Sequence, residues 1–151
     1  MPNTQAMCTS FKGELLTGTH NFGTAPVRAS GSADTFKAAL YLASATINAS
    51  TTAYTTTGEV SGTNYTAGGV TVTNATAPTT SGTTAYWTPS ASLVFTNVTL
   101  STAFDCVLIY NSTQSNRAVS VHTFGSQTVT AGTFTLTMPT NGAGTALINI
   151  A

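Results

Sequence analysis

Two histidines and four carboxylates are the side chains of this 151-residue chain that could take part in acid–base chemistry. A serine hydrolase needs a nucleophile, a histidine beside it and an acid that orients the ring, and Asp105 with His20 or His122 could supply the last two groups. No G-x-S-x-G nucleophile elbow accompanies them. The alternation in residues 117–124 turns His122 outward together with Ser120. We therefore expect no catalytic histidine.

The acidic residues do not form a recognisable catalytic pair. A glycosidase needs two carboxylates that face each other across a cleft. Glu14 belongs to a predicted helix, Asp105 starts an apolar strand, and no spacing brings either of them to Asp34 or Glu59. A free enzyme that degrades cell walls would need such carboxylates to converge in a groove. The sequence therefore predicts that the protein is not an enzyme.

No cofactor or metal is implied by the remaining candidate groups. Cys8 and Cys106 are far apart and lack clustered histidines, so they form no zinc signature. We expect buried thiols rather than a disulfide, because the chain is expected to mature in a reducing compartment. The glycines of Ala67–Gly69 match neither a G-x-G-x-x-G nor a Walker pattern. They indicate a sharp turn into the next strand, with Tyr65 anchoring the loop.

The sequence argues against nucleic acid and membranes as partners. The four basic residues are scattered singly, so no basic stripe is available to neutralise phosphates, and nucleic acid is not expected as a partner. No apolar run reaches the length of a membrane span, and residues 1–10 lack the pattern of a signal peptide. We expect no membrane association and maturation in a cytoplasm.

Composition predicts an all-β domain with an unusually uncharged surface. The chain contains 34 Thr and 14 Ser but only eight charged residues, and its formal net charge is zero. Threonine is β-branched and suits a pleated surface better than a helix. With so little charge, electrostatic repulsion does little to keep copies apart. The protein is expected to lie against other protein surfaces.

One helix is predicted near the N-terminus, within residues 7–18. Thr9 or Ser10 could cap its start, Glu14 would lie in its first turns, and Gly18 would end it. Three apolar residues, Met7, Phe11 and Leu15, recur at a spacing of four and would share one face. Two interpretations stay open: the helix packs on its own sheet, or residues 1–22 form an N-terminal arm docked on a neighbouring subunit.

Residues 23–151 are predicted to form a single β-sandwich or jelly-roll domain. Residues 23–34 are turn-rich and predict a surface loop, and residues 35–45 favour a strand over a helix. Period-two patterns follow, with a turn at Ser81-Gly82, a central strand at 106–110, and Phe134, Leu136 and Met138 facing inward between outward threonines. The later strands are expected at 91–100, 104–111, 117–124, 132–139 and 146–150. Edge strands carry few charged residues that would prevent pairing, so other chains are expected to cover them.

Four segments carry a resemblance to a known family. They read "SFKGELLTGTHNF", "DTFKAALYLASATINASTTAYTTTGEVSGTNYTAGGVTVTNAT", "LIYNSTQSNRAVSVHTFG" and "FTLTMP". Over residues 10–150 the chain resembles a family of small virion structural proteins of tailed bacteriophages. The elements "Y-T-x-x-G-E-V" and "G-x-x-Y-T-A-G-G" are the most specific part of the match.

The resemblance implies a particle component without enzymatic activity or catalytic residues. Its first implied role is a capsid cement or decoration protein that binds the major capsid protein, or other virion proteins, and associates with itself as a dimer or trimer. It would be located in the virion, assembled in the host cytoplasm. The alternative is a tail, connector or fibre-associated protein in which exposed aromatic residues such as Tyr86 and Trp87 contact a host receptor.

The resemblance also suggests a structural role for Glu59. Glu59 and Tyr65 would fix a connector between the strand at 35–45 and the strand that begins near residue 70. The carboxylate would accept hydrogen bonds from backbone amides of the turn at Gly68 and Gly69.

Overall fold

The computed structural model describes residues 3–16, 18–22, 33–73 and 77–151. Most of the loop predicted at 23–34 lies outside the described residues. The elements, in chain order, are β1 (Ala6–Met7), α1 (Thr9–Leu16), β2 (Phe36–Leu42), β3 (Val70–Thr71), β4 (Thr79–Ser81), β5 (Thr84–Trp87), β6 (Leu93–Asn111), β7 (Arg117–Leu136) and β8 (Ile148–Ile150).

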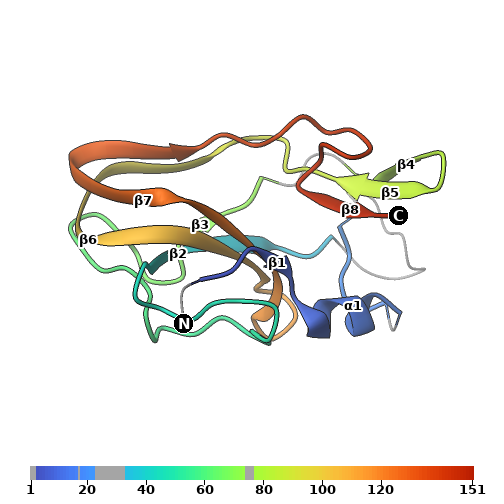
Figure 1. The fold of residues 1–151 in the computed structure, drawn as a ribbon, viewed down its shortest axis with the longest axis horizontal. Coiled ribbons are helices and arrows are strands. Elements are labelled where there is room, and N and C mark those ends of the chain that lie inside the picture. Colours follow the sequence, from blue (N-terminus) through green and yellow to red (C-terminus); the bar gives the residue numbers. More distant parts are fainter. Residues whose placement is uncertain (1–2, 17, 23–32, 74–76) are drawn as a thin grey trace.

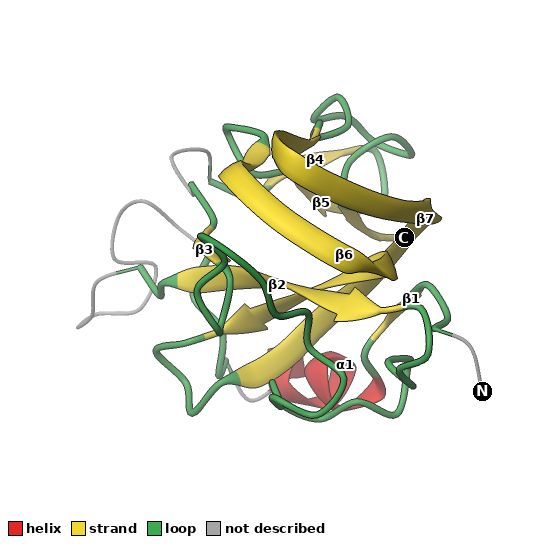
Figure 2. Cartoon of the chain, turned by 90° about the vertical axis from the view of Figure 1, so that its left-hand side faces the viewer, coloured by secondary structure: helices red, strands yellow, loops and turns green. Residues whose placement is uncertain are grey.

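The strands form two antiparallel sheets, so the predicted all-β sandwich with one short N-terminal helix is confirmed. The larger sheet has the order β1-β7-β6-β2-β3, and the smaller has the order β4-β5-β8 (Figures 1 and 2). The predicted turn at Ser81-Gly82 joins β4 to β5, where Ser81 pairs with Thr84. The described part of residues 1–22 contributes β1 to the edge of the larger sheet, where Met7 pairs with Ser120.

A single long hairpin, β6 with β7, replaces four predicted strands. Strands were expected at 91–100, 104–111, 117–124 and 132–139, with breaks between them, and these breaks are wrong. Pairing continues through the polar residues with shifts of register, among them one between Leu100 and Phe104. Such bulges bend and twist a ladder without ending it, which explains why the polar residues do not terminate the strands.

The bent hairpin supplies both layers of the core. Figure 1 shows it curving back over itself, so that one half lies above the other. We call residues 104–111 and 117–123 the lower arm, and residues 93–100 and 129–136 the upper arm. The Phe104 ring of the lower arm meets the Phe134 ring of the upper arm edge to face, with centroids 5.0 Å apart. Phe104 is fully buried, so this contact ties the two arms together.

The centre of the lower arm is buried on both faces, as predicted for residues 106–110. Each residue from Cys106 to Tyr110 is at most 3% exposed. On one face, Val107 and Ile109 line a pocket together with Leu93 and Leu136 of the upper arm. On the other, Tyr54 of the β2–β3 connector stacks on Tyr110 at 4.8 Å. Both cysteines are free and buried, as expected, and burial raises the pKa of Cys8 to about 11.

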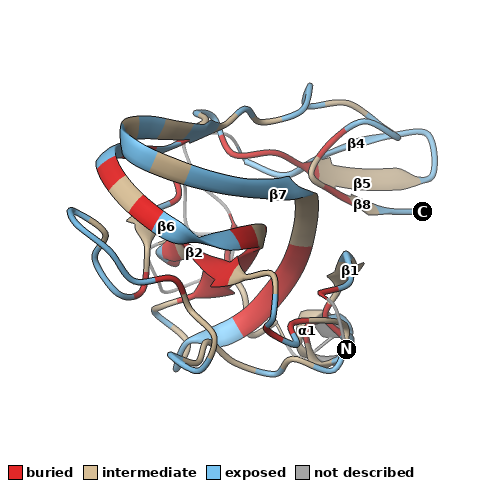
Figure 3. Cartoon of the chain, turned by 60° about the vertical axis from the view of Figure 1, so that its left-hand side comes forward, coloured by how far each residue is buried: buried red, intermediate tan, exposed pale blue. Residues whose placement is uncertain are grey.

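The alternation predicted at the end of β7 is confirmed. Inward-facing side chains of the upper arm are buried on β6 and partly buried on β7, and those that face outward are exposed, as the pale band along β7 in Figure 3 shows. We call five of the exposed residues, on the upper arm and directly after it, the threonine face: Val94, Thr96, Thr133, Thr135 and Thr137.

Helix α1 differs in detail from the prediction. It begins at Thr9, so Cys8 precedes it and neither Thr9 nor Ser10 takes the capping position. Glu14 lies in its last turn rather than its first turns. Gly18, with φ 64°, ends the helix as predicted: its N–H bonds to the carbonyl of Leu15, and the N–H of Thr19 bonds to that of Glu14. This pair of bonds is the Schellman motif.

Met7 does not share a helical face with Phe11 and Leu15. It belongs to β1, because residues 6 and 7 pair with the edge of β7 before the helix begins. Within the described residues, no helix combines the length and the apolar character needed to cross a membrane.

Candidate functional site

The Glu59 carboxylate lies at the centre of the long connector between β2 and β3. Its Oε1 accepts hydrogen bonds from the Gly68 amide at 2.7 Å and from the Tyr65 hydroxyl at 2.8 Å. Its Oε2 accepts one from the Tyr54 hydroxyl at 2.6 Å. Of the two turn amides that the resemblance suggested as donors, that of Gly68 bonds to the carboxylate, whereas that of Gly69 donates to the Thr66 carbonyl.

Two of the tyrosine hydroxyls around Glu59 link the connector to the sheet. The Tyr65 oxygen accepts a hydrogen bond from the Leu40 amide of β2 at 3.0 Å, and the Tyr110 hydroxyl of β6 donates to the Gly68 carbonyl at 2.8 Å. Burial, together with the Glu59 carboxylate, raises the pKa of Tyr65 and of Tyr54 well above the usual range. The phenols stay protonated and donate, so the arrangement fixes a loop and offers no mobile proton.

Gly69 allows the glycine turn to touch β2. Its φ is 70°, and a Cβ at this position would lie 1.8 Å from the carbonyl oxygen of Ala38. No side chain fits such a gap, and the left-handed backbone adds strain for any residue other than glycine. The predicted sharp turn therefore has a steric reason as well as a conformational one.

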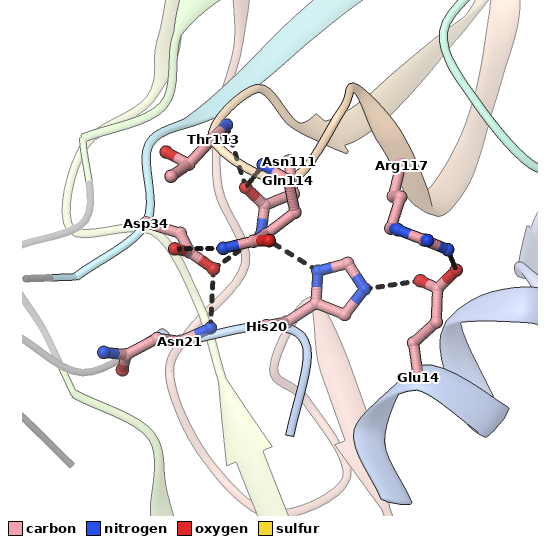
Figure 4. A network of polar contacts seen from close by, with 8 residues as sticks. All are labelled: Glu14, His20, Asn21, Asp34, Asn111, Thr113, Gln114 and Arg117. Atoms are coloured by element: carbon pink, nitrogen blue, oxygen red, sulfur yellow. Dashed lines mark hydrogen bonds and ion pairs between the residues drawn. The ribbon is translucent and has the colours of Figure 1, made fainter. Parts of the chain in front are cut away.

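A second polar network joins α1 to the start of the β6–β7 turn (Figure 4). His20 Nε2 lies 2.6 Å from Glu14 Oε2, and His20 Nδ1 lies 3.0 Å from the Asn111 side-chain amide. The same amide donates to Asp34 Oδ2 at 2.8 Å. Arg117 pairs with the other oxygen of Glu14. The residues of this network come from distant parts of the sequence, and Glu14 and Arg117 are 103 positions apart. Sequence spacing therefore did not reveal the cluster.

This network holds groups in place rather than preparing them for reaction. The His20 side chain is fully buried, and Asn111 Oδ1 accepts hydrogen bonds from the amides of Thr113 and Gln114, both at 3.1 Å. Burial raises the pKa of Glu14, but hydrogen bonds and charge from His20 and Arg117 outweigh it and lower the pKa below its ordinary value. The ion pair with Arg117 also compensates a carboxylate at the unfavourable C-terminal end of a helix.

The acid considered for a hydrolase lies elsewhere. Asp105 Oδ1 accepts a hydrogen bond from the Asn3 side-chain amide at 2.6 Å. Asn3 also donates to the Leu42 carbonyl and accepts from the Ile47 amide. Asp105 thus fastens the N-terminal segment, and the structure pairs neither His20 nor His122 with it.

The expectation that Ser120 and His122 face outward is wrong. Ser120 is 3% exposed and His122 is partly buried, because both faces of this part of β7 are covered. His122 Nε2 lies 2.9 Å from Ser120 Oγ. Burial lowers the pKa of His122 to about 4. A ring with so low a pKa is a weak base for deprotonating a serine hydroxyl at neutral pH.

The apolar residues considered for partner contact are divided between core and surface. Phe11 is 1% exposed and contacts the rings of His20 and Phe22, whereas Met7 and Leu15 are partly buried. Packing of α1 on its own domain therefore accounts for Phe11. Trp87, considered for receptor contact, is 2% exposed and meets Phe22 edge to face. Its burial favours packing over recognition.

Phe11, Leu15 and Trp87 line an entirely apolar pocket of about 100 Å³ beside β5 and β8. A group of three or more His, Cys, Asp or Glu side chains able to hold a metal ion does not occur in the described part of the chain.

Replacing Glu59 tests the structural role of its carboxylate. Glu59→Gln removes the charge that three donors share, and we expect a loss of about 2 kcal/mol of unfolding free energy, or a melting temperature lower by roughly 4–8 °C. Thermal unfolding measures the change. Thr57→Lys, on the exposed part of the same connector, changes net charge equally and should leave stability within about 0.5 kcal/mol. An unchanged melting temperature for Glu59→Gln contradicts the role.

A matched pair of glycines tests the contact between the turn and β2. Gly69→Ala should cost more than about 3 kcal/mol or prevent folding, because the added methyl overlaps backbone that cannot move aside. Gly82→Ala, also at positive φ but with nothing within 4 Å of the added atom, should cost only about 1–2 kcal/mol. Chemical denaturation of both variants gives the comparison, and equal losses would show that the close approach is unimportant.

The low pKa of His122 predicts acid sensitivity. In the unfolded chain this ring binds a proton near pH 6.5, and in the folded chain near pH 4. Stability is therefore full above pH 6.5 and falls by up to roughly 3 kcal/mol as the pH drops to 4. Urea unfolding at a series of pH values measures this slope. His122→Gln should flatten it between pH 6.5 and 4, and a slope that persists unchanged in the variant would assign the effect to other groups.

Comparisons with known proteins add no identity: no family model, no curated protein and no solved structure matches this chain.

Proposed function

We propose that this protein is a structural component of a tailed-bacteriophage virion, and more specifically a cement protein that binds the major capsid protein. The observation that carries the proposal is the threonine face. It is a broad, exposed strand surface that presents hydroxyl and methyl groups and carries no charged residue. The family resemblance over residues 10–150 supports the same role.

The distribution of charge supports docking against other protein. All four carboxylates are engaged within the fold: Glu14 with His20 and Arg117, Asp34 with Asn111, Glu59 with its tyrosines and Asp105 with Asn3. Contact with a partner would therefore strip little hydration from carboxylates, whose desolvation is costly. The threonine hydroxyls can form hydrogen bonds with either water or a partner.

Weak contacts suffice for this role when they are repeated. A capsid presents the same surface many times, and a dimer or trimer of this protein could engage several copies together. Multivalent attachment then raises the overall affinity without any single strong contact. The receptor contact considered for the tail, connector or fibre alternative involved Tyr86 and Trp87. Trp87 is 2% exposed and gives this contact no support, whereas Tyr86 is partly exposed.

A charge placed on the threonine face tests the proposal. Thr135→Lys should weaken binding to capsids that lack the protein by at least about 30-fold, because an unpaired ammonium would be desolvated in the contact. Co-sedimentation with capsids measures binding. Ser50→Lys, an equal change of charge at an exposed loop position, is the matched control and should bind normally.

The same particles distinguish the two virion roles. Quantitative mass spectrometry of purified virions should find a copy number comparable with that of the major capsid protein. A copy number of a few per particle would place the protein in the tail or connector, and its absence from virions would overturn the proposal.

A further inference from the structure

A pocket of about 240 Å³ opens between the two arms of the β6–β7 hairpin. Its lower wall comes from Val107, Ile109 and His122, and its upper wall from residues of β6, β7 and the segment before β8. These upper residues are Leu93, Leu136, Met138 and Leu147. The pocket therefore lies where the fold of the hairpin leaves the sandwich incompletely filled.

The pocket is mostly apolar, but the polar side chains of Gln5, Thr123, Thr137 and His122 also line it. Among these four, His122 is the one that bonds to the buried Ser120. Its Nε2 lies 2.9 Å from Ser120 Oγ, and Ser120 is 3% exposed. A buried hydroxyl needs an acceptor for its proton, and His122 Nε2 is the acceptor that the described residues provide. If Ser120 donates, the neutral ring carries its own proton on Nδ1. The imidazole then offers one N–H donor to the pocket that it lines.

Because the His122 ring is neutral, it favours an uncharged molecule in the pocket. Burial holds the pKa of His122 near 4, so the imidazole is neutral at physiological pH. An anion would gain no ion pair there and would lose its hydration among apolar side chains. A neutral acceptor, such as a carbonyl oxygen, meets the N–H without that cost.

The volume of the pocket limits the size of an occupant. An apolar cavity of about 150 Å³ is sufficient for benzene, and sites for drug-sized ligands begin at about 300 Å³. A space of about 240 Å³ therefore suits one ring with a short substituent.

We propose that this pocket binds a small, uncharged and mostly apolar molecule that carries one hydrogen-bond acceptor, with the His122 ring as its polar contact. This proposal is independent of the proposed role in the virion. The pocket beside α1 differs, because it is smaller and its lining is entirely apolar. It can hold apolar groups but has no polar atom to orient them.

Acetophenone and ethylbenzene form a matched pair of probes, because they differ in a carbonyl group and are similar in size. Titration of the folded protein, followed by the methyl NMR signals of Ile109, Leu136 and Leu147, should show binding of acetophenone with a dissociation constant of about 1 mM or tighter. Ethylbenzene should bind roughly 5–10-fold more weakly, since it forms no hydrogen bond. His122→Phe should remove this difference between the two probes.

Two further measurements control for folding and for the wrong pocket. Met138→Trp, which fills the site from its rim, should abolish binding of both probes while the melting temperature shows that the protein is folded. Trp87 is the single tryptophan of the native chain and lines the other pocket, so its fluorescence should stay unchanged when acetophenone binds. The proposal is overturned if no methyl signal shifts, if both probes bind equally well, or if only Trp87 responds.

Discussion

The continuous pairing of β6 with β7 is the constraint on which the rest of the structure depends. Because the ladder bends without breaking, one hairpin supplies the centre of the larger sheet and the layer above it. Its lower arm presents Tyr110 to the glycine turn and Asn111 to the network of His20. Its upper arm presents the threonine face, and the space between the arms contains the pocket beside His122. A break in the ladder would separate all of these features.

Carboxylates of this chain hold segments that have no regular structure. The long connector between β2 and β3 is fixed by one carboxylate and its donors, and the N-terminal segment by another. Both carboxylates are partly buried, and removing a carboxylate from water is favourable only where hydrogen bonds replace those to water. Using the charges inside the fold leaves the outer strands with threonine, which keeps them hydrated without fixing a sign of charge.

Alternation and apolar runs in the sequence correctly predicted core-facing residues in two strand segments. Alternation identified which side of β7 faces inward at Phe134, and the unbroken apolar run identified residues 106–110 as a central strand. The ends of the strands were not predicted correctly, because a segment rich in serine and threonine can form either a turn or a bulge within a continuous strand. Met7 was assigned to the helix, since its spacing fits a helix and pairing with Ser120 on a distant strand leaves no local signal.

For the candidate sites too, contacts between residues close in sequence were predicted and contacts between distant residues were not. Glu59 lies close in sequence to Tyr65 and Gly68, so the suggested resemblance and the glycine turn predicted a contact among them. Glu14, Asp34 and Asn111 meet only because the sheet brings distant segments together, and no spacing could show this. Ser120 was placed outside because alternation assumes one covered face, whereas this part of β7 is covered on both.

The covering of Ser120 connects the fold to the chemistry of the pocket. A serine and a histidine two positions apart on a strand normally lie at the surface, where water satisfies both. Here the bend of β7 draws them under the upper arm, so each must satisfy the other. The result is a neutral ring in a mostly apolar pocket that Gln5, Thr123 and Thr137 also line. Under both proposals the partner is neutral: the pocket would hold it through a hydrogen bond to the His122 ring, and the threonine face would bind it through many interchangeable contacts.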